Sequence, residues 1–150
     1  MGHDGKRSVL FACTGNTCRS VMAEHLARKL LQDRLNVASA GFHPQDPKDT
    51  ANAAHTLLKY GIDASGHIPK DIRTVDIDQF DIVVAMDPGI AESVRRTFPS
   101  FPAERLLVWK IDDPWGDNQG NLVRYQKAAE AILQALPTLR PMVVAPTESP

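Results

Sequence analysis

The fold is decided by the segment SVLFACTGNTCRSVMAEHLARKLL at residues 8–31, where a short apolar run meets an amphipathic pattern. The run at 9–12 is typical of a buried strand. Apolar residues that recur every four positions then predict a helix over 20–32. The polar turn CTGNTCRS at 13–20 therefore joins the carboxyl end of a strand to the amino end of a helix.

The alternation of strand and helix continues along the chain. Further strands are predicted at 36–40, 80–86 and 105–111, and further helices at 50–60, 88–98 and 122–136. Short apolar strands separated by helices indicate a parallel sheet that is covered on both faces. We therefore expect an α/β fold with a four-stranded parallel sheet, doubly wound, with helices on both faces. Ligands bind such sheets at the carboxyl ends of the strands, where the turn at 13–20 lies.

Length and composition are those of one domain. The 150 residues fit a single domain, 1–150, with a core at about 7–137 and loose ends at 1–6 and 138–150. A net charge of −1 provides no general attraction to nucleic acid or to an anionic membrane. Apolar runs of five residues are too short to span a bilayer, and two cysteines five positions apart do not make a secreted disulfide framework. We expect a cytoplasmic monomer.

The turn has the composition of an anion-binding site. A helix amino terminus offers unpaired N–H groups and the positive end of the helix dipole. Gly15 and Asn16 readily adopt left-handed backbone angles, which let successive N–H groups point inward. Arg19 supplies a planar cation that can bind two oxygens of a phosphate-like anion. The predicted phosphate-binding loop consists of Thr14, Gly15, Asn16, Thr17, Cys18 and Ser20.

Cys13 begins this loop and is the candidate nucleophile. The helix dipole and Arg19 favour its thiolate form, and Ser20 either caps the helix or donates a hydrogen bond to the thiolate. A thiolate that faces a bound phosphoryl group can displace the leaving group, become a thiophosphate ester and be regenerated by water. This chemistry needs neither a metal nor another cofactor. The alternative is that Cys13 and Cys18 are small buried apolar residues of the turn.

Expulsion of an alkoxide or phenoxide requires a proton donor, and three Asp-Pro steps are candidates. Asp46, Asp87 and Asp113 each follow a predicted strand, and the residue types alone do not choose among them. Trp115, two positions after Asp113, offers a wall for a flat substrate. The five histidines show neither an i, i+4 pair nor a cysteine–histidine cluster, so no metal site is predicted.

Four motifs resemble those of the low-molecular-weight protein tyrosine phosphatases: VLFACTGNTCRSVMAEHL, SAGF, VVAMD and DDPWG, spread over residues 7–137. The resemblance implies a metal-free enzyme that hydrolyses phosphotyrosine in a phosphorylated protein substrate through a phosphocysteine intermediate. It makes Cys13 the nucleophile, Arg19 the phosphate ligand and Asp113 the general acid. It also implies a loop-shaping role for Asn16, thiolate stabilisation by Ser20, a reversible disulfide of Cys18 with Cys13, and a structural role for Asp87.

Two departures from the family pattern leave the substrate open. The loop GFHPQDPKD looks short beside members with a longer aromatic-bearing loop, so one wall of the substrate slot is either missing or supplied by Phe42 or His43. Thr17 stands where many tyrosine phosphatases carry an aliphatic residue, and in this it resembles the bacterial protein arginine phosphatases of the same family. A hydroxyl can hydrogen-bond a polar substrate or an attacking water. We place phosphotyrosine first, because Trp115 beside the acid favours an aryl leaving group, and phosphoarginine second.

Two other functions use similar turns. A thioredoxin-coupled arsenate reductase shares this fold and anion loop, and GHIPKDI is similar to a segment of such reductases, but their route needs a relay of three cysteines and this chain has only Cys13 and Cys18. A flavin-binding electron carrier is the second alternative, because TGNT after a first strand is similar to the phosphate loop of flavodoxins. Those loops need neither the leading cysteine nor the following arginine, and a flavin carrier would purify yellow.

Overall fold

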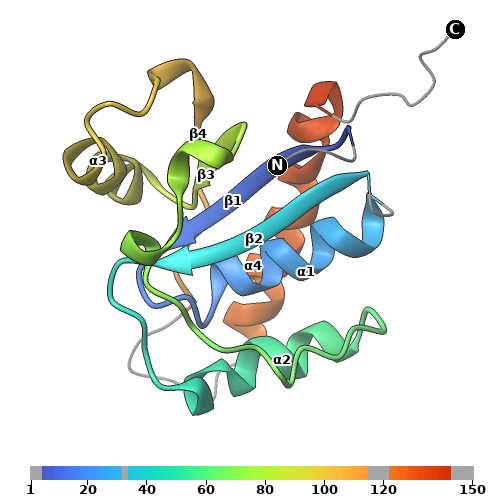
Figure 1. The fold of residues 1–150 in the computed structure, drawn as a ribbon. Helices are drawn as coiled ribbons and strands as arrows, with labels where there is room; N and C mark the ends of the chain where they lie inside the picture. Colours follow the sequence, from blue (N-terminus) through green and yellow to red (C-terminus); the bar gives the residue numbers. More distant parts are fainter. Residues whose placement is uncertain (1–4, 32–33, 115–121, 143–150) are drawn as a thin grey trace, which may run out of the picture.

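Four parallel strands form one sheet, in the order β2-β1-β3-β4 (Figure 1). The computed structural model describes residues 5–31, 34–114 and 122–142. The strands are β1 (Arg7–Cys13), β2 (Leu35–Gly41), β3 (Ile82–Ala85) and β4 (Leu106–Val108). This arrangement confirms the predicted four-stranded parallel α/β fold.

Helices cover both faces of the sheet (Figure 1). The helices α1 (Arg19–Leu30), α2 (Ala51–Leu58) and α4 (Leu122–Ala135) pack on one face, and α3 (Pro88–Thr97) packs on the other. Alternate residues of β1 supply the two cores: Phe11 and Cys13 lie in the cluster with α1 and α4, whereas Leu10 and Ala12 lie in the cluster with α3. Strand β1 is therefore buried on both sides, as its continuous apolar run predicts.

The observed bounds of two elements differ from the predicted ones. Strand β4 is shorter than the predicted 105–111, yet the N–H groups of Trp109 and Ile111 still donate to the carbonyls that end β3 and follow it. The predicted helix 50–60 is preceded by a 3₁₀ turn at Pro47–Thr50, whose N-cap Asp46 accepts from the Lys48 N–H at 2.9 Å. Asp46 is therefore occupied with local turn chemistry.

The expectation of a loose chain from residue 138 onward is wrong for residues 138–142. A 3₁₀ helix at Leu136–Met142 continues α4, with Leu139 and Met142 buried in the cluster of α1 and α4. Thr138 accepts a hydrogen bond from the Trp109 indole at 3.1 Å. The prolines of this segment suggested an end to ordered structure, but the burial of its apolar side chains stabilises a tighter helix in their presence.

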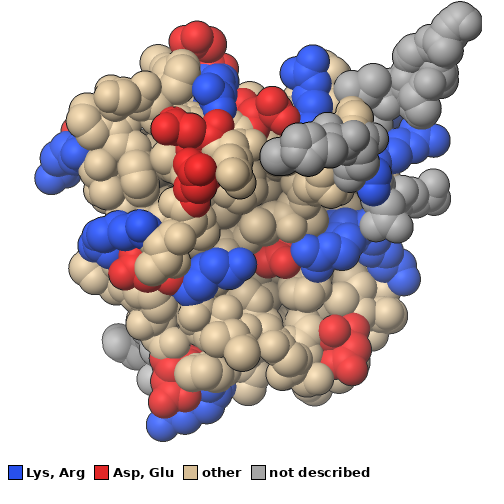
Figure 2. Space-filling model, viewed as in Figure 1, with Lys and Arg blue, Asp and Glu red and all other residues tan. Residues whose placement is uncertain are grey.

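The surface carries both signs of charge. On the face shown in Figure 2, Lys and Arg side chains are interspersed with Asp and Glu, and neither sign dominates. Within the described ranges, no helix has the length and apolar character needed to cross a membrane.

Candidate active site

The turn between β1 and α1 is shaped by a buried asparagine. Asn16 has φ 56°, the only positive φ of a non-glycine residue in the described part of the chain. Its side-chain amide donates to Ser20 Oγ and Ser39 Oγ, both at 2.9 Å, and its side-chain oxygen accepts from the Lys70 N–H at 3.0 Å. His67 Nε2 lies 2.9 Å from the Asn16 backbone carbonyl oxygen. These bonds stabilise a left-handed conformation that an isolated L-residue disfavours.

Gly15 does not have the predicted left-handed angle. A Cβ at Gly15 would lie 2.7 Å from Cδ of Gln45, so the flexible end of the Gln45 side chain would have to move aside. Gly41, at the end of β2, is packed even more tightly against the loop. A Cβ there would lie 2.5 Å from the Thr14 carbonyl oxygen and 2.8 Å from the Asn16 backbone nitrogen. The motif SAGF therefore positions the loop from the neighbouring strand.

The backbone carbonyls of the loop are hydrogen-bonded within the protein, whereas its N–H groups are not. The carbonyls of Cys13, Thr14 and Gly15 accept from N–H groups of the 42–45 segment at 3.2, 2.8 and 3.1 Å. The N–H groups of residues 14–19 have no protein acceptor among the residues that the structure describes. With the amino end of α1 beside them, they are available to bind an anion.

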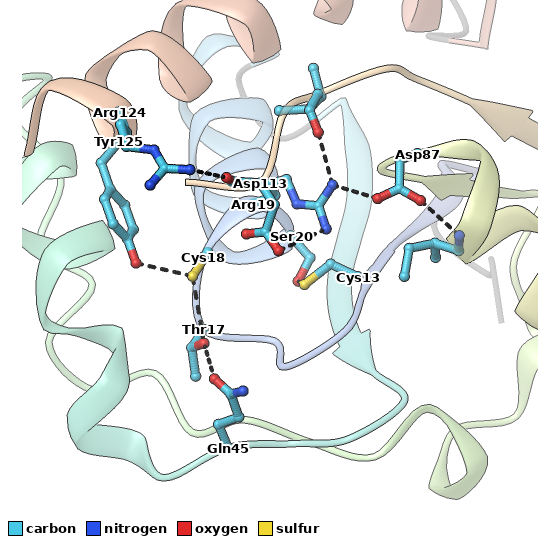
Figure 3. Close-up of polar contacts among 12 residues, drawn as sticks. Cys13, Thr17, Cys18, Arg19, Ser20, Gln45, Asp87, Asp113, Arg124 and Tyr125 are labelled. Atoms are coloured by element: carbon cyan, nitrogen blue, oxygen red, sulfur yellow. Dashed lines mark hydrogen bonds and ion pairs between the residues drawn. The ribbon is translucent and has the colours of Figure 1, made fainter. Parts of the chain in front are cut away.

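A small cavity, the loop pocket, lies beside these N–H groups and has a volume of about 80 Å³. Its lining consists of Cys13, Thr14, Gly15, Thr17, Cys18, Arg19, Gln45 and Asp113. Cys13 Sγ is 2.8 Å from Ser20 Oγ (Figure 3), and Ser20 lies inside α1, whose N-cap residue is Cys18. Since the Asn16 amide donates to Ser20 Oγ, the Ser20 hydroxyl can direct its own proton to Cys13.

Arg19 is buried at the inner end of the pocket, with only 3% of its side chain exposed. Its Nη1 donates to Asp87 Oδ2 and to the Ile111 carbonyl, both at 2.8 Å. Its Nη2 lies 3.7 Å from Asp113 Oδ2 (Figure 3). The guanidinium is thus fixed at one nitrogen and faces the pocket, which pre-organises it for a bound oxyanion.

The three Asp-Pro steps have different surroundings. Asp46 begins a surface turn, and Asp87 caps α3 through the Ile90 N–H at 2.8 Å while it binds Arg19. Partial burial opposes ionisation of Asp87, but the hydrogen bonds from Arg19 and Ile90 outweigh it and hold the pKa of this carboxyl below its usual value. Asp113 alone of the three lines the loop pocket, and 48% of its side chain is exposed.

Cys18 lies in a line of polar contacts at the other side of the pocket. Its Sγ is 3.2 Å from the Tyr125 hydroxyl of α4, and Thr17 Oγ1 donates to Gln45 Oε1 at 3.2 Å (Figure 3). Burial raises the pKa of the Cys18 thiol to about 11, although the hydrogen bonds from Tyr125 and Thr17 oppose the shift. Sequence reasoning missed Gln45 and Tyr125, because neither stands in a motif and only the tertiary fold places them at the loop.

Neither of the two described residues of the predicted substrate wall lines the loop pocket. Phe42 is 7% exposed and packs in the cluster of α3, so it does not line the loop pocket; the pleat of the chain after β2 turns its ring to that face. His43 has an exposed side chain outside the pocket lining, and its role stays a prediction. Trp115 lies outside the described residues.

The model of the low molecular weight phosphotyrosine protein phosphatase family matches residues 8–144. The chain belongs to this family. The membership agrees with the resemblance in the sequence motifs and leaves the flavin-binding alternative without support.

Similar proteins of this family carry several names. Arsenate reductase 1 of Bacillus cereus is 36% identical over 75% of this chain and 81% of its own length. The solved low molecular weight protein tyrosine phosphatase from T. tengcongensis is 32% identical with a TM-score of 0.77, over 89% of this chain and 97% of that one. An arginine phosphatase from Geobacillus stearothermophilus is 26% identical with a TM-score of 0.76, over 90% and 94%.

Proposed function

We propose that this protein is a cysteine-dependent phosphatase that hydrolyses phosphotyrosine in proteins. One observation carries the proposal: Cys13, Arg19 and Asp113 converge on a single pocket beside backbone N–H groups that have no acceptor among the described residues. A nucleophile, an oxyanion ligand and an acid on one pocket are the parts that phosphoryl transfer requires.

The proposed reaction has two steps. The phosphate group lies in the loop pocket, held by the N–H groups of 14–19 and by Arg19. The Cys13 thiolate, stabilised by the Ser20 hydroxyl, attacks phosphorus, while Asp113 gives its proton to the departing phenolic oxygen. Asp113 then takes a proton from water, which attacks the phosphocysteine and releases inorganic phosphate and the free thiolate. No electron is transferred, and no metal is required.

A phosphorylated arginine is the second candidate substrate. Thr17 supports it, since this buried hydroxyl lines the pocket and is bonded to Gln45, which makes the pocket wall polar. The similar arginine phosphatase from Geobacillus stearothermophilus supports it too. We place phosphotyrosine first because a half-exposed carboxyl at the pocket suits protonation of a phenoxide.

Arsenate reduction is a third candidate, favoured by the names of the curated relatives. Arsenate would bind where phosphate does, but its reduction needs two electrons from two thiols. The only second thiol of the chain is Cys18, which is buried beside Tyr125 and whose pKa is raised to about 11. Such a thiol attacks slowly, and the chain has no third thiol to reduce the resulting Cys13–Cys18 disulfide, so each turnover would depend on a thiol from another molecule.

The test of the mechanism is hydrolysis of p-nitrophenyl phosphate in the presence of EDTA. We expect Cys13→Ser and Arg19→Ala to lower kcat at least about 1000-fold. Asp113→Ala should lower kcat at least about 100-fold, more for poor leaving groups, whereas Asp46→Ala should not. Full activity of Cys13→Ser would overturn the mechanism, and equal effects of the two aspartate variants would show that Asp113 is not the acid.

The test of the substrate compares initial rates on phosphotyrosine and phosphoarginine peptides, with arsenite production from arsenate and a thiol reductant measured in parallel. We expect the highest kcat/KM on phosphotyrosine and a further shift toward it in Thr17→Ile. A higher kcat/KM on phosphoarginine, or turnover of arsenate alone, would overturn phosphotyrosine as the proposed substrate. It would not overturn Cys13 as the proposed nucleophile.

We also propose that Cys18 protects Cys13 from irreversible oxidation by peroxide. Peroxide transfers one oxygen to the Cys13 thiolate, which becomes a sulfenic acid, and the Cys18 thiol then displaces that oxygen as water to form a disulfide, which an external thiol reduces. Both cysteines are free and line the same pocket. After peroxide treatment and then dithiothreitol, wild-type activity should return and Cys18→Ser activity should not. Equal recovery of the two would leave Cys18 with a packing role only.

A further inference from the structure

Three potential metal ligands come together on the side of α1 that faces the 66–72 segment. Glu24 and His25 are neighbours on α1, and His67 lies in the segment after α2. The ligand atoms that these three side chains offer all lie within 4.8 Å of one another. All three side chains are partly buried, and the rings of His25 and His67 meet edge to face with centroids 6.2 Å apart.

One ring nitrogen of His67 is held by the backbone, which leaves the other nitrogen for a metal. Its Nε2 lies 2.9 Å from the Asn16 carbonyl oxygen, which can only accept, so Nε2 carries the hydrogen. In the neutral ring the lone pair is then on Nδ1, where a metal can bind. Metal-bound histidines commonly donate their other ring N–H to a backbone carbonyl or a carboxylate, which fixes the ring and its tautomer.

The other two ligands are compatible with the same ion. Glu24 accepts from Ser39 Oγ at 2.5 Å and from Arg28 at 2.7 Å, which orients its carboxylate. A carboxylate can accept further bonds at both oxygens. The ring of His25 lies beside that of His67, and a neutral imidazole can coordinate a cation through its unprotonated nitrogen.

We propose that Glu24, His25 and His67 form a binding site for one Zn²⁺-class divalent ion, separate from the loop pocket. Two imidazoles and one carboxylate are a ligand set that zinc accepts, with water in the remaining position. Tetrahedral bonds of about 2.1 Å place ligand atoms roughly 3.4 Å apart, so rotations of these side chains close the site. The sequence predicted no metal site, because His67 is far from α1 along the chain and the fold alone joins them.

The site is linked to the catalytic loop by two routes of direct contact. His67 holds the Asn16 backbone, and Glu24 holds Ser39, which accepts from the Asn16 side chain. A bound ion would therefore tie α1 and the 66–72 segment to the residue that shapes the loop. We expect it to raise the stability of the folded chain by mass action.

The test is isothermal titration with Zn²⁺ of protein that carries Cys13→Ser, Cys18→Ser and His3→Ala. These changes remove the thiols, which bind zinc, and the histidine outside the described residues. We expect one equivalent of Zn²⁺ to bind. His25→Ala and His67→Ala should each weaken binding at least tenfold, while the exposed controls His43→Ala and His55→Ala should change it less than twofold.

His25→Ala is the decisive variant, because none of its recorded contacts reaches the loop and the variant is expected to fold. Binding by His25→Ala as tight as that of the parent would overturn the proposal, as would equal losses in all four histidine variants. Glu24→Gln should also weaken binding, and a melting temperature raised by Zn²⁺ in the parent but not in His25→Ala is a second readout. The outcome does not depend on the proposed phosphatase activity, since the parent already lacks Cys13.

Discussion

At the scale of single residues, Gly41 controls the shape of the loop from outside it. The left-handed Asn16 is fixed by side-chain hydrogen bonds, and its backbone nitrogen lies only 2.8 Å from the position that a Cβ of residue 41 would take. The neighbours of that Cβ are backbone atoms of Thr14, Gly15 and Asn16, which cannot rotate away as a side chain can. Any larger residue at position 41 must therefore displace the loop or the strand.

We predict that Gly41→Ala damages both stability and catalysis. The new methyl group would meet the Thr14 carbonyl oxygen at 2.5 Å, so the loop must shift, at a cost of about 1–3 kcal/mol in the free energy of unfolding. A displaced loop should lower kcat for p-nitrophenyl phosphate at least about tenfold, since its N–H groups would no longer match the transition state. Urea unfolding and steady-state kinetics measure the two effects.

Gly66→Ala is the matched control for this substitution. A Cβ at Gly66 would have nothing within 4 Å, and the residue has no positive φ. It should leave kcat unchanged and alter the free energy of unfolding by less than about 1 kcal/mol. Wild-type kinetics in Gly41→Ala would mean that the loop accommodates the methyl group and that its position is not critical.

The sequence predicted the residues whose chemistry is visible in their type and order. Cys13, Arg19 and Ser20 stand in one turn, and local spacing was enough to bring them together. The choice of Asp113 among three Asp-Pro steps needed a family resemblance. Gln45, Tyr125 and the pair of His25 with His67 depend on distances across the fold, which neither periodicity nor turn chemistry encodes.

At the scale of elements, the sequence pattern located the four strands of the sheet, but it predicted the ends of the elements less accurately than their positions. The predicted strand 105–111 contains Trp109 and Ile111, whose N–H groups still follow β3 although the ladder ends at Val108. The chain from 138 to 142 was misjudged because its prolines are a local signal, whereas the burial of Leu139 is a tertiary effect. Local signals predict where an element can begin, and packing decides how far it extends.

Asp87 has two roles at the start of α3: its side chain caps the helix, and its charge pairs with that of the buried Arg19. Asp87→Asn keeps a capping side chain but removes the charge, so we expect a loss of about 1–2 kcal/mol in unfolding free energy at pH 7. The pKa of Asp87 is lowered in the fold, so its contribution is present above the unfolded pKa and is lost as pH falls through the folded value. The difference between wild type and variant should therefore shrink below about pH 4.

Asp46→Asn is the control for the charge effect. Asp46 is also an N-cap before a proline, but it is exposed and has no buried cation beside it. Its substitution should change the unfolding free energy by less than about 0.5 kcal/mol at every pH. Urea unfolding at pH 3, 4, 5 and 7 compares the two variants, and a penalty in Asp87→Asn that persists undiminished at pH 3 would contradict the assignment.

At the scale of the whole molecule, the loop is held by segments from most of the chain. Strand β2 supplies Gly41, the 42–45 segment binds the loop carbonyls, the 66–72 segment binds Asn16, and α3 begins at the partner of Arg19. Parallel strands bring these segments to one edge of the sheet, as the position of the turn predicted. A substitution that displaces these segments should therefore change the loop and lower activity. A substitution at the opposite end of the sheet should lower the stability of the fold without changing kcat.

The segment after α4 tests this separation, because it lies near the start of β1, at the other end of that strand from the turn into α1 (Figure 1). Leu139 is fully buried in the core of α1 and α4, so Leu139→Ala should cost about 2–4 kcal/mol of unfolding free energy through lost burial and the cavity left behind. Leu58→Ala, at a residue 60% exposed on α2, should cost less than about 1 kcal/mol. Below its melting temperature, Leu139→Ala should keep wild-type kcat on p-nitrophenyl phosphate. Equal stability of the two variants in urea would mean that residues 136–142 contribute nothing to the core.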